Sequence, residues 1–267
     1  MNLLAAVLYL CVGALLWHGL RRPRTASHGA RLGIYILAVG AVTAHAAVLY
    51  TGLLHEGGLN LGFTNAASLV AWAIAVLFLL ASLTRPIESL GIFIMPVAAA
   101  TVFIDWLLPR HGTLIMTVTP MQSAHIVISL LAYSLLSIAV VQSLMLAWVE
   151  RRLRQRHQPS RLLHALPPLE TMENLMFQLI TLGFVLLTLT VISGVFFSEQ
   201  LFNEPLAFTD HVVLSIIAWI VFAVLLAGRW RFGWRGRTAV RWTLGGFTLL
   251  AFAYFGSKFA LEILLRH

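Results

Sequence analysis

The sequence predicts an all-α protein: a polytopic integral membrane bundle of eight transmembrane helices, with both termini outside. Three observations support this fold class. The 267 residues contain eight apolar runs of about 18 to 25 residues, each long enough to cross a hydrocarbon core of roughly 30 Å as a helix. Hydrophobic residues make up 60% of the chain and charged residues only 10%, too little polar surface for a soluble protein. The loops between the runs alternate between arginine-rich and arginine-poor.

The eight spans are expected at residues 2–20, 32–54, 65–84, 88–108, 123–149, 175–197, 211–228 and 239–264, within one transmembrane domain of residues 1–267. Continuous apolar runs favour helices, because the strands of a membrane barrel would read as alternating segments of about ten residues. Pro96 falls inside the fourth span and is expected to kink it. Gly183 and Gly194 in the sixth span and Gly245-Gly246 in the eighth are expected to let helices approach closely.

The basic residues predict the orientation. The first, third, fifth and seventh loops hold 15 of the 18 lysines and arginines, so the positive-inside rule places these loops in the cytoplasm. The loops near residues 55–63, 109–122 and 198–210 then lie outside. The longest loop, residues 150–174, is interpreted as a cytoplasmic loop with an amphipathic segment that begins as a helical extension of the fifth span. The pattern indicates a multi-pass protein of the bacterial inner membrane.

Charge and motifs exclude several functions. The formal net charge of +8 comes mainly from arginines beside the spans, which favours contact with the lipid bilayer and gives no support to nucleic acid binding. Cys11, the one cysteine, lies within the first apolar run and excludes a disulfide or a thiolate metal cage. Phosphate-binding loops, zinc-protease motifs and nucleophile motifs are missing, so no catalytic residue is predicted and the chain is not expected to be an enzyme.

Six of the ten histidines lie in the outer half of the predicted membrane or in the outer loops. Ionisable residues at membrane depth are expensive and indicate a function by default. His125 is the first candidate, because it starts the fifth span and shares a helical face with Ser129 and Tyr133. Its imidazole could ligate a metal such as haem iron, or could be an interfacial histidine bonded to a neighbouring loop; both interpretations stay open.

Four further histidines are candidate cofactor ligands. His45, near the middle of the second span, is the second candidate metal ligand, although a buried imidazole can equally be satisfied by a hydrogen-bonding partner. His55 lies about 15 Å further along that helix, so it cannot share one metal ion with His45 unless the helix breaks. His211, at the start of the seventh span, and His267, the last residue, are weaker candidates.

Several runs of the sequence resemble one family. They are GFTNAASLVAW (Gly62 to Trp72), the span from His125 through Tyr133 to Trp148, Trp219 to Arg229, Gly233-Trp234-Arg235-Gly236-Arg237 and Tyr254-Phe255-Gly256. Together they resemble the CcsA-type cytochrome c assembly proteins, and especially their short YpjD-like branch, over roughly residues 55–260.

The resemblance implies a haem-handling protein that holds or passes haem at the outer face for attachment to apocytochrome c. It implies that His125 is an external haem ligand and that a second one lies near Leu265, where His267 is a displaced substitute. Two departures stand against this. The sixth loop lacks the tryptophans of the haem-handling members, and Ala227 stands where they have a histidine within the membrane.

Two functions from different classes therefore remain open. In the first, the chain binds haem (the cofactor) through His125 and one of His45, His55, His211 or His267, with cytochrome c assembly proteins or apocytochrome c as partners. In the second, it is a non-enzymatic membrane scaffold or partner subunit that has lost haem handling. Transport of a small solute is a third and weaker alternative, because the central parts of the spans carry almost no charge.

Overall fold

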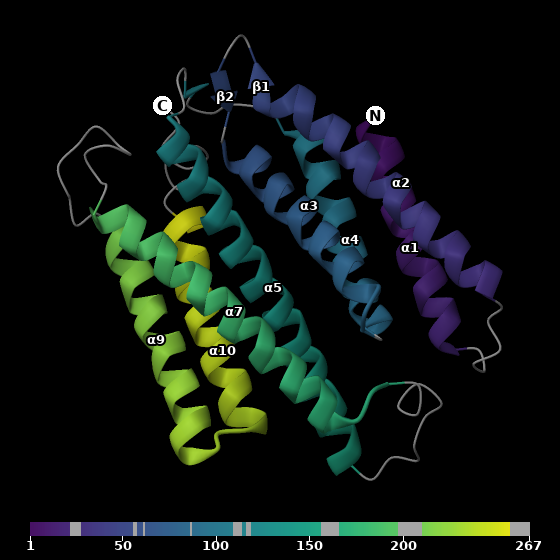
Figure 1. Ribbon diagram of the computed structural model, residues 1–267. Coiled ribbons are helices and arrows are strands. Elements are labelled where there is room, and N and C mark those ends of the chain that lie inside the picture. The colour runs from purple at the N-terminus through teal and green to yellow at the C-terminus, as the bar shows by residue number, and fades with distance from the viewer. Residues whose placement is uncertain are drawn as a thin grey trace. The chain divides into compact units, whose positions relative to one another are not determined.

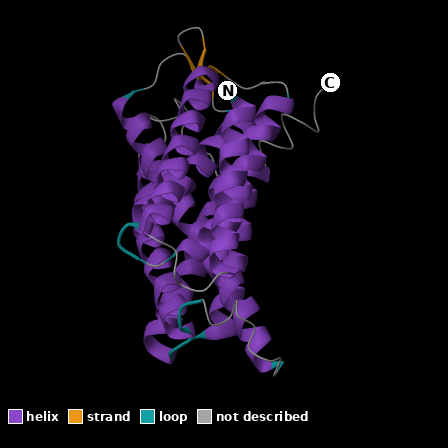
Figure 2. Cartoon of the chain, turned by 90° about the vertical axis from the view of Figure 1, so that its right-hand side faces the viewer, coloured by secondary structure: helices purple, strands orange, loops and turns teal. Residues whose placement is uncertain are grey.

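A computed structural model describes residues 1–21, 28–55, 58–60, 62–85, 87–108, 114–115, 119–155, 166–196 and 210–256. These residues are almost entirely helical, and strand is confined to one small region (Figure 2). The chain divides into two compact units (Figure 1). The first unit comprises residues 1–114 and 151–168, and the second comprises residues 115–150 and 169–267.

The first unit is a bundle of the four helices α1 (Asn2–Arg21), α2 (His28–Leu53), α3 (Phe63–Ser82) and α4 (Glu88–Leu107). α1 packs against α2 and α4, and α3 packs against the same two helices (Figure 1). Tyr9, Leu90 and Met95 are among its largest fully buried side chains. α4 is one continuous helix through Pro96, and a Cβ at Gly13 of α1 would lie 3.5 Å from the proline Cδ. The glycine therefore lets α1 run close along the proline face of α4.

Short strands, which were not predicted, follow α2. β1 (Leu54–His55) pairs antiparallel with β2 (Gly58–Asn60), with Leu54 opposite Leu59. Asn65 of α3 donates hydrogen bonds from Nδ2 to the carbonyl oxygens of Gly52 and Asn60, each at 3.2 Å. Backbone groups that leave a helix need new partners, and the strand pairing and this asparagine supply them. A two-residue strand, β3 (Leu114–Ile115), stands where the first unit ends along the chain and the second begins.

The second unit contains α5 (Pro120–Arg154) as far as Glu150, α7 (Leu169–Phe196), α9 (Asp210–Phe232) and α10 (Gly236–Ala251). A π-helical turn, η1 (Phe252–Gly256), continues α10. α9 packs against α7, α10 and η1. α5 meets α7 through the buried Gln142, whose Nε2 donates to the carbonyl of Met172 at 2.8 Å. Leu136 and Phe222 lie in the core of this unit.

The predicted spans agree with the helices for most of the chain. Within the described residues, seven helices are long and apolar enough to cross a membrane. Large apolar side chains are exposed along them, as lipid-facing positions require; examples are Leu4, Ile36, Phe93, Leu182 and Ile220. The eighth predicted span corresponds to α10 and η1 up to Gly256, and its residues 257–264 lie outside the described part of the chain. The eighth crossing and the outer placement of both termini stay predictions.

Several helix boundaries differ from the predicted spans; α2, for example, begins at His28 and not at residue 32. α5 continues through Arg154, so the predicted helical extension is confirmed to that residue. α7 begins at Leu169, six residues before the predicted position, directly after Pro167 and Pro168. Residues 156–165 of the predicted cytoplasmic loop 150–174 lie outside the described residues, and its amphipathic segment stays a prediction.

Candidate functional site

The start of α5 determines where His125 lies. The Thr119 N–H donates to Oε1 of Gln122 at 2.9 Å, and the Gln122 N–H donates to Oγ1 of Thr119 at 3.2 Å. This reciprocal pair is a capping box, and Pro120 occupies the first helical position, where its missing N–H costs nothing. The cap starts α5 at Pro120, which places His125 on the second turn of the helix.

A hydroxyl of α7 meets the ring of His125. Nδ1 of the half-buried ring lies 2.7 Å from Oγ of Ser193. The same hydroxyl lies 3.0 Å from the carbonyl of Thr190, which can only accept. With the hydroxyl proton on that carbonyl, Ser193 accepts from Nδ1, and the neutral ring has its lone pair on Nε2. Gly194 follows Ser193, and a Cβ there would meet the imidazole Cε1 at 3.6 Å, so this side of the ring faces bare backbone.

The polar stripe predicted along α5 divides into two parts. Ser129 turns back to its own helix and donates from Oγ to the carbonyl of His125 at 2.8 Å. Tyr133 extends away from the helix, and its ring lies 5.3 Å from that of Phe247 in α10 and 5.5 Å from that of Phe255 in η1. The Tyr133 hydroxyl is buried and has no hydrogen-bonding partner in the described part of the chain.

His45 lies in a different environment. The residue is fully buried in the first unit, with Nδ1 3.1 Å from the hydroxyl of Tyr9 in α1 and Nε2 2.9 Å from Oγ of Ser68 in α3. The Tyr9 ring also meets the imidazole edge to face, with centroids 5.6 Å apart. Both ring nitrogens are engaged in this arrangement, so it leaves no lone pair for a metal. His45 joins three helices of the first unit.

The other predicted ligands that the structure describes lie on other elements than α5. His55 lies on β1, where its backbone pairs with Gly58. His211 is exposed on the first turn of α9, and its carbonyl accepts a hydrogen bond from Ser215 at 2.7 Å. His267 lies outside the described residues. No cluster of three or more histidine, cysteine or acidic residues that could hold a metal ion occurs among the residues searched.

The Gly233-to-Arg237 motif forms the turn between α9 and α10. Gly233 and Gly236 have φ angles of +65° and +52°, a region that other residues rarely occupy. The Trp234 ring folds back onto Gly228 of α9, where a Cβ would overlap the indole. Glycine at three positions is thus what allows the chain to reverse so tightly.

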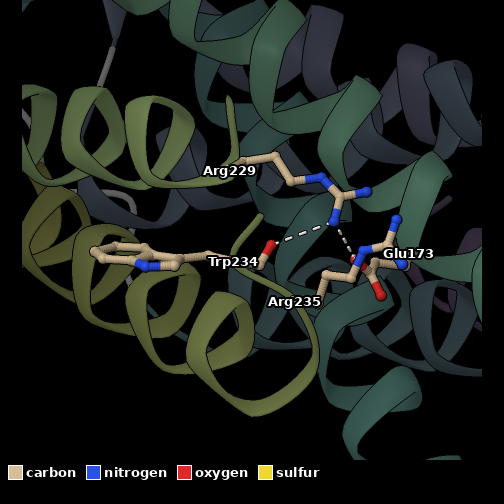
Figure 3. Close-up of polar contacts among 4 residues, drawn as sticks. All are labelled: Glu173, Arg229, Trp234 and Arg235. Carbon is tan, nitrogen blue, oxygen red and sulfur yellow. Dashed lines mark hydrogen bonds and ion pairs between the residues drawn. The ribbon is translucent and has the colours of Figure 1, made fainter. Parts of the chain in front are cut away.

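An ion-pair cluster fastens this turn to α7 (Figure 3). Arg229 donates from a terminal guanidinium nitrogen to Oε1 of Glu173 at 2.6 Å and to the carbonyl of Trp234 at 3.3 Å. The Arg229 guanidinium also lies 4.5 Å from the centroid of the Phe177 ring, and Nε of Arg235 approaches Glu173 at 3.6 Å. This motif, one of those that carry the resemblance, therefore has a structural role, joining α7, α9 and α10.

The sequence analysis missed the partners of both histidines. Ser193, which lies 2.7 Å from Nδ1 of His125, is one of several hydroxyl residues in an apolar run, and Thr190 beside it carries no separate signal. Gly194 was expected to allow a close helix approach, and its backbone does lie against the His125 ring. Tyr9 and Ser68 are equally unmarked within their spans. The one available signal was that a serine within a helix can donate its hydroxyl to the backbone carbonyl three residues earlier, as Ser193 can to Thr190.

Comparison with known proteins agrees with the resemblance. The chain is 35% identical over 269 residues to the inner membrane protein YpjD of Escherichia coli, with 98% of each protein covered, which confirms a multi-pass protein of the inner membrane. It is 32% identical over 87 residues to the cytochrome c biogenesis protein CcsA of a Synechocystis species, covering 33% of this chain and 26% of that protein. The profile of the family described as cytochrome C assembly protein matches residues 34–265. The chain belongs to the cytochrome c assembly protein family.

Proposed function

We propose that this protein binds haem, with Nε2 of His125 as a ligand of the iron, and holds it at the outer face of the membrane for cytochrome c assembly. The observation that carries the proposal is the hydrogen-bond series from Thr190 through Ser193 to His125. Ligating histidines almost always donate their other ring N–H to a fixed acceptor, which sets the tautomer and the ring orientation. Ser193 is such an acceptor. Membership of the cytochrome c assembly family supports haem as the ligand.

Aromatic side chains that could pack against a planar apolar ligand occur in the unit that contains His125. α5, α10 and η1 bring Tyr133, Phe247 and Phe255 together, and Trp219 of α9 stacks on Phe184 of α7 with centroids 5.6 Å apart. Haem supplies an iron porphyrin whose chemistry belongs to the cofactor. The chain's residues bind it, orient it and exclude water, so a binding role needs no general acid or base.

A second ligand would come from the same side of the membrane. α5 and α9 are the fifth and seventh predicted spans, so both would run inward from the outer face, with His125 and His211 near their starts. We therefore favour His211 as the second ligand in the described part of the second unit, with His267 as its alternative. His55 is less favoured because it belongs to the first unit. His45 is not part of the proposed site, because Tyr9 and Ser68 engage both of its ring nitrogens.

The test is the absorption spectrum of protein purified in detergent from haem-replete cells. The wild type is expected to show a haem Soret band, and His125→Ala to lose it. His125→Gly with added imidazole should recover the band, because free imidazole can fill the space of the missing ligand. His18→Ala, which removes an exposed histidine of α1, is the matched control and should keep the band. A wild-type protein without haem, or a full band in His125→Ala, would overturn the proposal.

One observation favours a second candidate, a membrane scaffold that has lost haem handling. Residues 198–210, the predicted sixth loop, contain no tryptophan, whereas the resemblance implies a tryptophan-rich loop there in haem-handling members. Such a scaffold would act by contact with another assembly protein. Colourless protein that co-purifies with a cytochrome c assembly component would favour this second function.

A further inference from the structure

Tyr133, two turns along α5 from His125, has a polar atom without a hydrogen-bonding partner in the described part of the chain. Its hydroxyl is buried and lacks a hydrogen-bonding partner within the described residues. Hydroxyls buried among apolar groups cost stability unless they are hydrogen-bonded, and such atoms are rare in folded proteins. Elsewhere in the same unit the Trp219 indole N–H donates to Oγ1 of Thr188 at 2.8 Å. Oε1 of Gln142, further along α5, is also buried without a partner among the described residues, but Nε2 of the same side chain is hydrogen-bonded.

The surroundings of this hydroxyl are aromatic. The Phe247 ring is tilted by 60° to the Tyr133 ring, and the Phe255 ring stands nearly perpendicular to it at 78°. Phe255 comes from η1, where the change from α-helix to π-helix alters the direction of the side chains. Single π-helical turns occur frequently at functional sites. Such rings give a ligand apolar faces to pack on and leave the phenol as the polar group.

Tyr133 and His125 are eight residues apart on one helix, which places them on one face and about 12 Å apart along the axis. A haem that spans this face would present two kinds of polar group: the iron at its centre and two propionate carboxylates at one edge. The phenol is a hydrogen-bond donor that lacks an acceptor among the described residues, and a propionate is an acceptor. Donation to an anion in apolar surroundings is among the strongest hydrogen bonds in proteins.

Resting on the proposed function, we propose that the Tyr133 hydroxyl donates a hydrogen bond to a propionate carboxylate of the haem whose iron His125 ligates. Tyr133 is thus the second anchor of the ligand and sets the direction in which the porphyrin lies.

The experiment compares Tyr133→Phe with the wild type in two states. Without haem, the variant should melt at the same temperature or higher, because the substitution removes a hydroxyl that has no partner. When apoprotein in detergent is titrated with haem, the variant should bind about tenfold more weakly, the change expected for the loss of one charge-assisted hydrogen bond. A residue with only a packing role would not combine unchanged stability with weaker binding.

The porphyrin edge supplies the complementary control. Haem dimethyl ester has blocked carboxylates, so the wild type should bind it about tenfold more weakly than haem. Tyr133→Phe should bind the ester almost as tightly as the wild type binds it. This arm needs only the wild type if the variant fails to fold. Tyr9→Phe is the matched control: it removes a hydroxyl bonded to His45, so it should lower the melting temperature and leave haem affinity unchanged.

The outcomes separate the two proposals. Equal haem affinity in Tyr133→Phe and the wild type, together with loss of haem in His125→Ala, would overturn the role of Tyr133 and leave the proposed function standing. A difference between Tyr133→Phe and the wild type that persists with the dimethyl ester would also overturn it, because the hydroxyl would then act on something other than a carboxylate. If the wild type binds no haem, both proposals fail.

Discussion

His45 and His125 both lie within helices long enough to cross a membrane, yet their hydrogen bonds leave them with different chemistry. In the first unit, hydroxyls from two other helices engage both nitrogens of His45. In the second unit, Nδ1 of His125 lies 2.7 Å from Oγ of Ser193, a hydroxyl that also lies 3.0 Å from the carbonyl of Thr190 in its own helix. The comparison teaches that the partners of a membrane histidine, more than its depth, decide its role.

The largest expected effect is an all-or-none difference in thiol labelling, which tests on which side of the membrane His125 lies. After Cys11→Ala removes the native thiol, Met121→Cys at the start of α5 and Trp230→Cys at the end of α9 place single thiols on residues that are 36% and 88% exposed. A membrane-impermeant maleimide applied to spheroplasts should label the first, and the second only after the membrane is opened. The opposite labelling would put His125 on the cytoplasmic side and remove the basis for an outer haem site.

His45→Ala tests the other half of the comparison. The substitution leaves a cavity and two buried hydroxyls without partners, so it should lower the free energy of unfolding by about 4 kcal/mol, measured by thermal melting in detergent. The folded fraction should keep its haem band at the wild-type intensity per molecule. Loss of haem from folded His45→Ala protein would show that His45 is a ligand and that its bonds to Tyr9 and Ser68 are broken on binding.

Ser193→Ala should have the smallest effect. It removes the acceptor that orients His125 and leaves the ligating nitrogen in place, so haem affinity should fall by about tenfold, as measured by titration of apoprotein. Thr188→Ala, a hydroxyl change elsewhere on α7 that affects the Trp219 indole, is the control and should leave affinity unchanged. Wild-type affinity in Ser193→Ala would mean that the serine does not position the ring.

Much of the fold could be predicted because the backbone finds no hydrogen-bonding partners in lipid and must form its hydrogen bonds within helices. Length and hydropathy therefore identify the helices. The basic run after the fifth span predicted a helical extension, and α5 continues through Arg154. The start of α7 was placed too late, although Pro168 marks it. The short strands after α2 depend on pairing between neighbouring segments of a loop, which carries no hydropathy signal.

The candidate site was less predictable than the fold. His45 follows a mostly apolar run (AVGAVTA, residues 38–44) and His125 follows the polar start of a span (TPMQSA, residues 119–124), but neither stretch indicates the partners of its histidine. The residues that distinguish them are 68 positions away in one case and 36 and 23 positions away in the other. Helix packing alone brings these partners together, and no local pattern encodes it. The capping box at Thr119 and Gln122 is the exception, because its spacing is readable directly.

The pairing of Arg229 with Glu173 bears on how this chain is built. While the helices are separate, Arg229 is a full positive charge beside a span and counts toward topology as its neighbours do. Once α7 and α9 meet, the same guanidinium is neutralised by a carboxylate 2.6 Å away and covered by the Phe177 ring. One residue can therefore help to orient the chain during membrane insertion and later hold two helices together by an ion pair in the folded protein. Its replacement would disturb both stages of biogenesis.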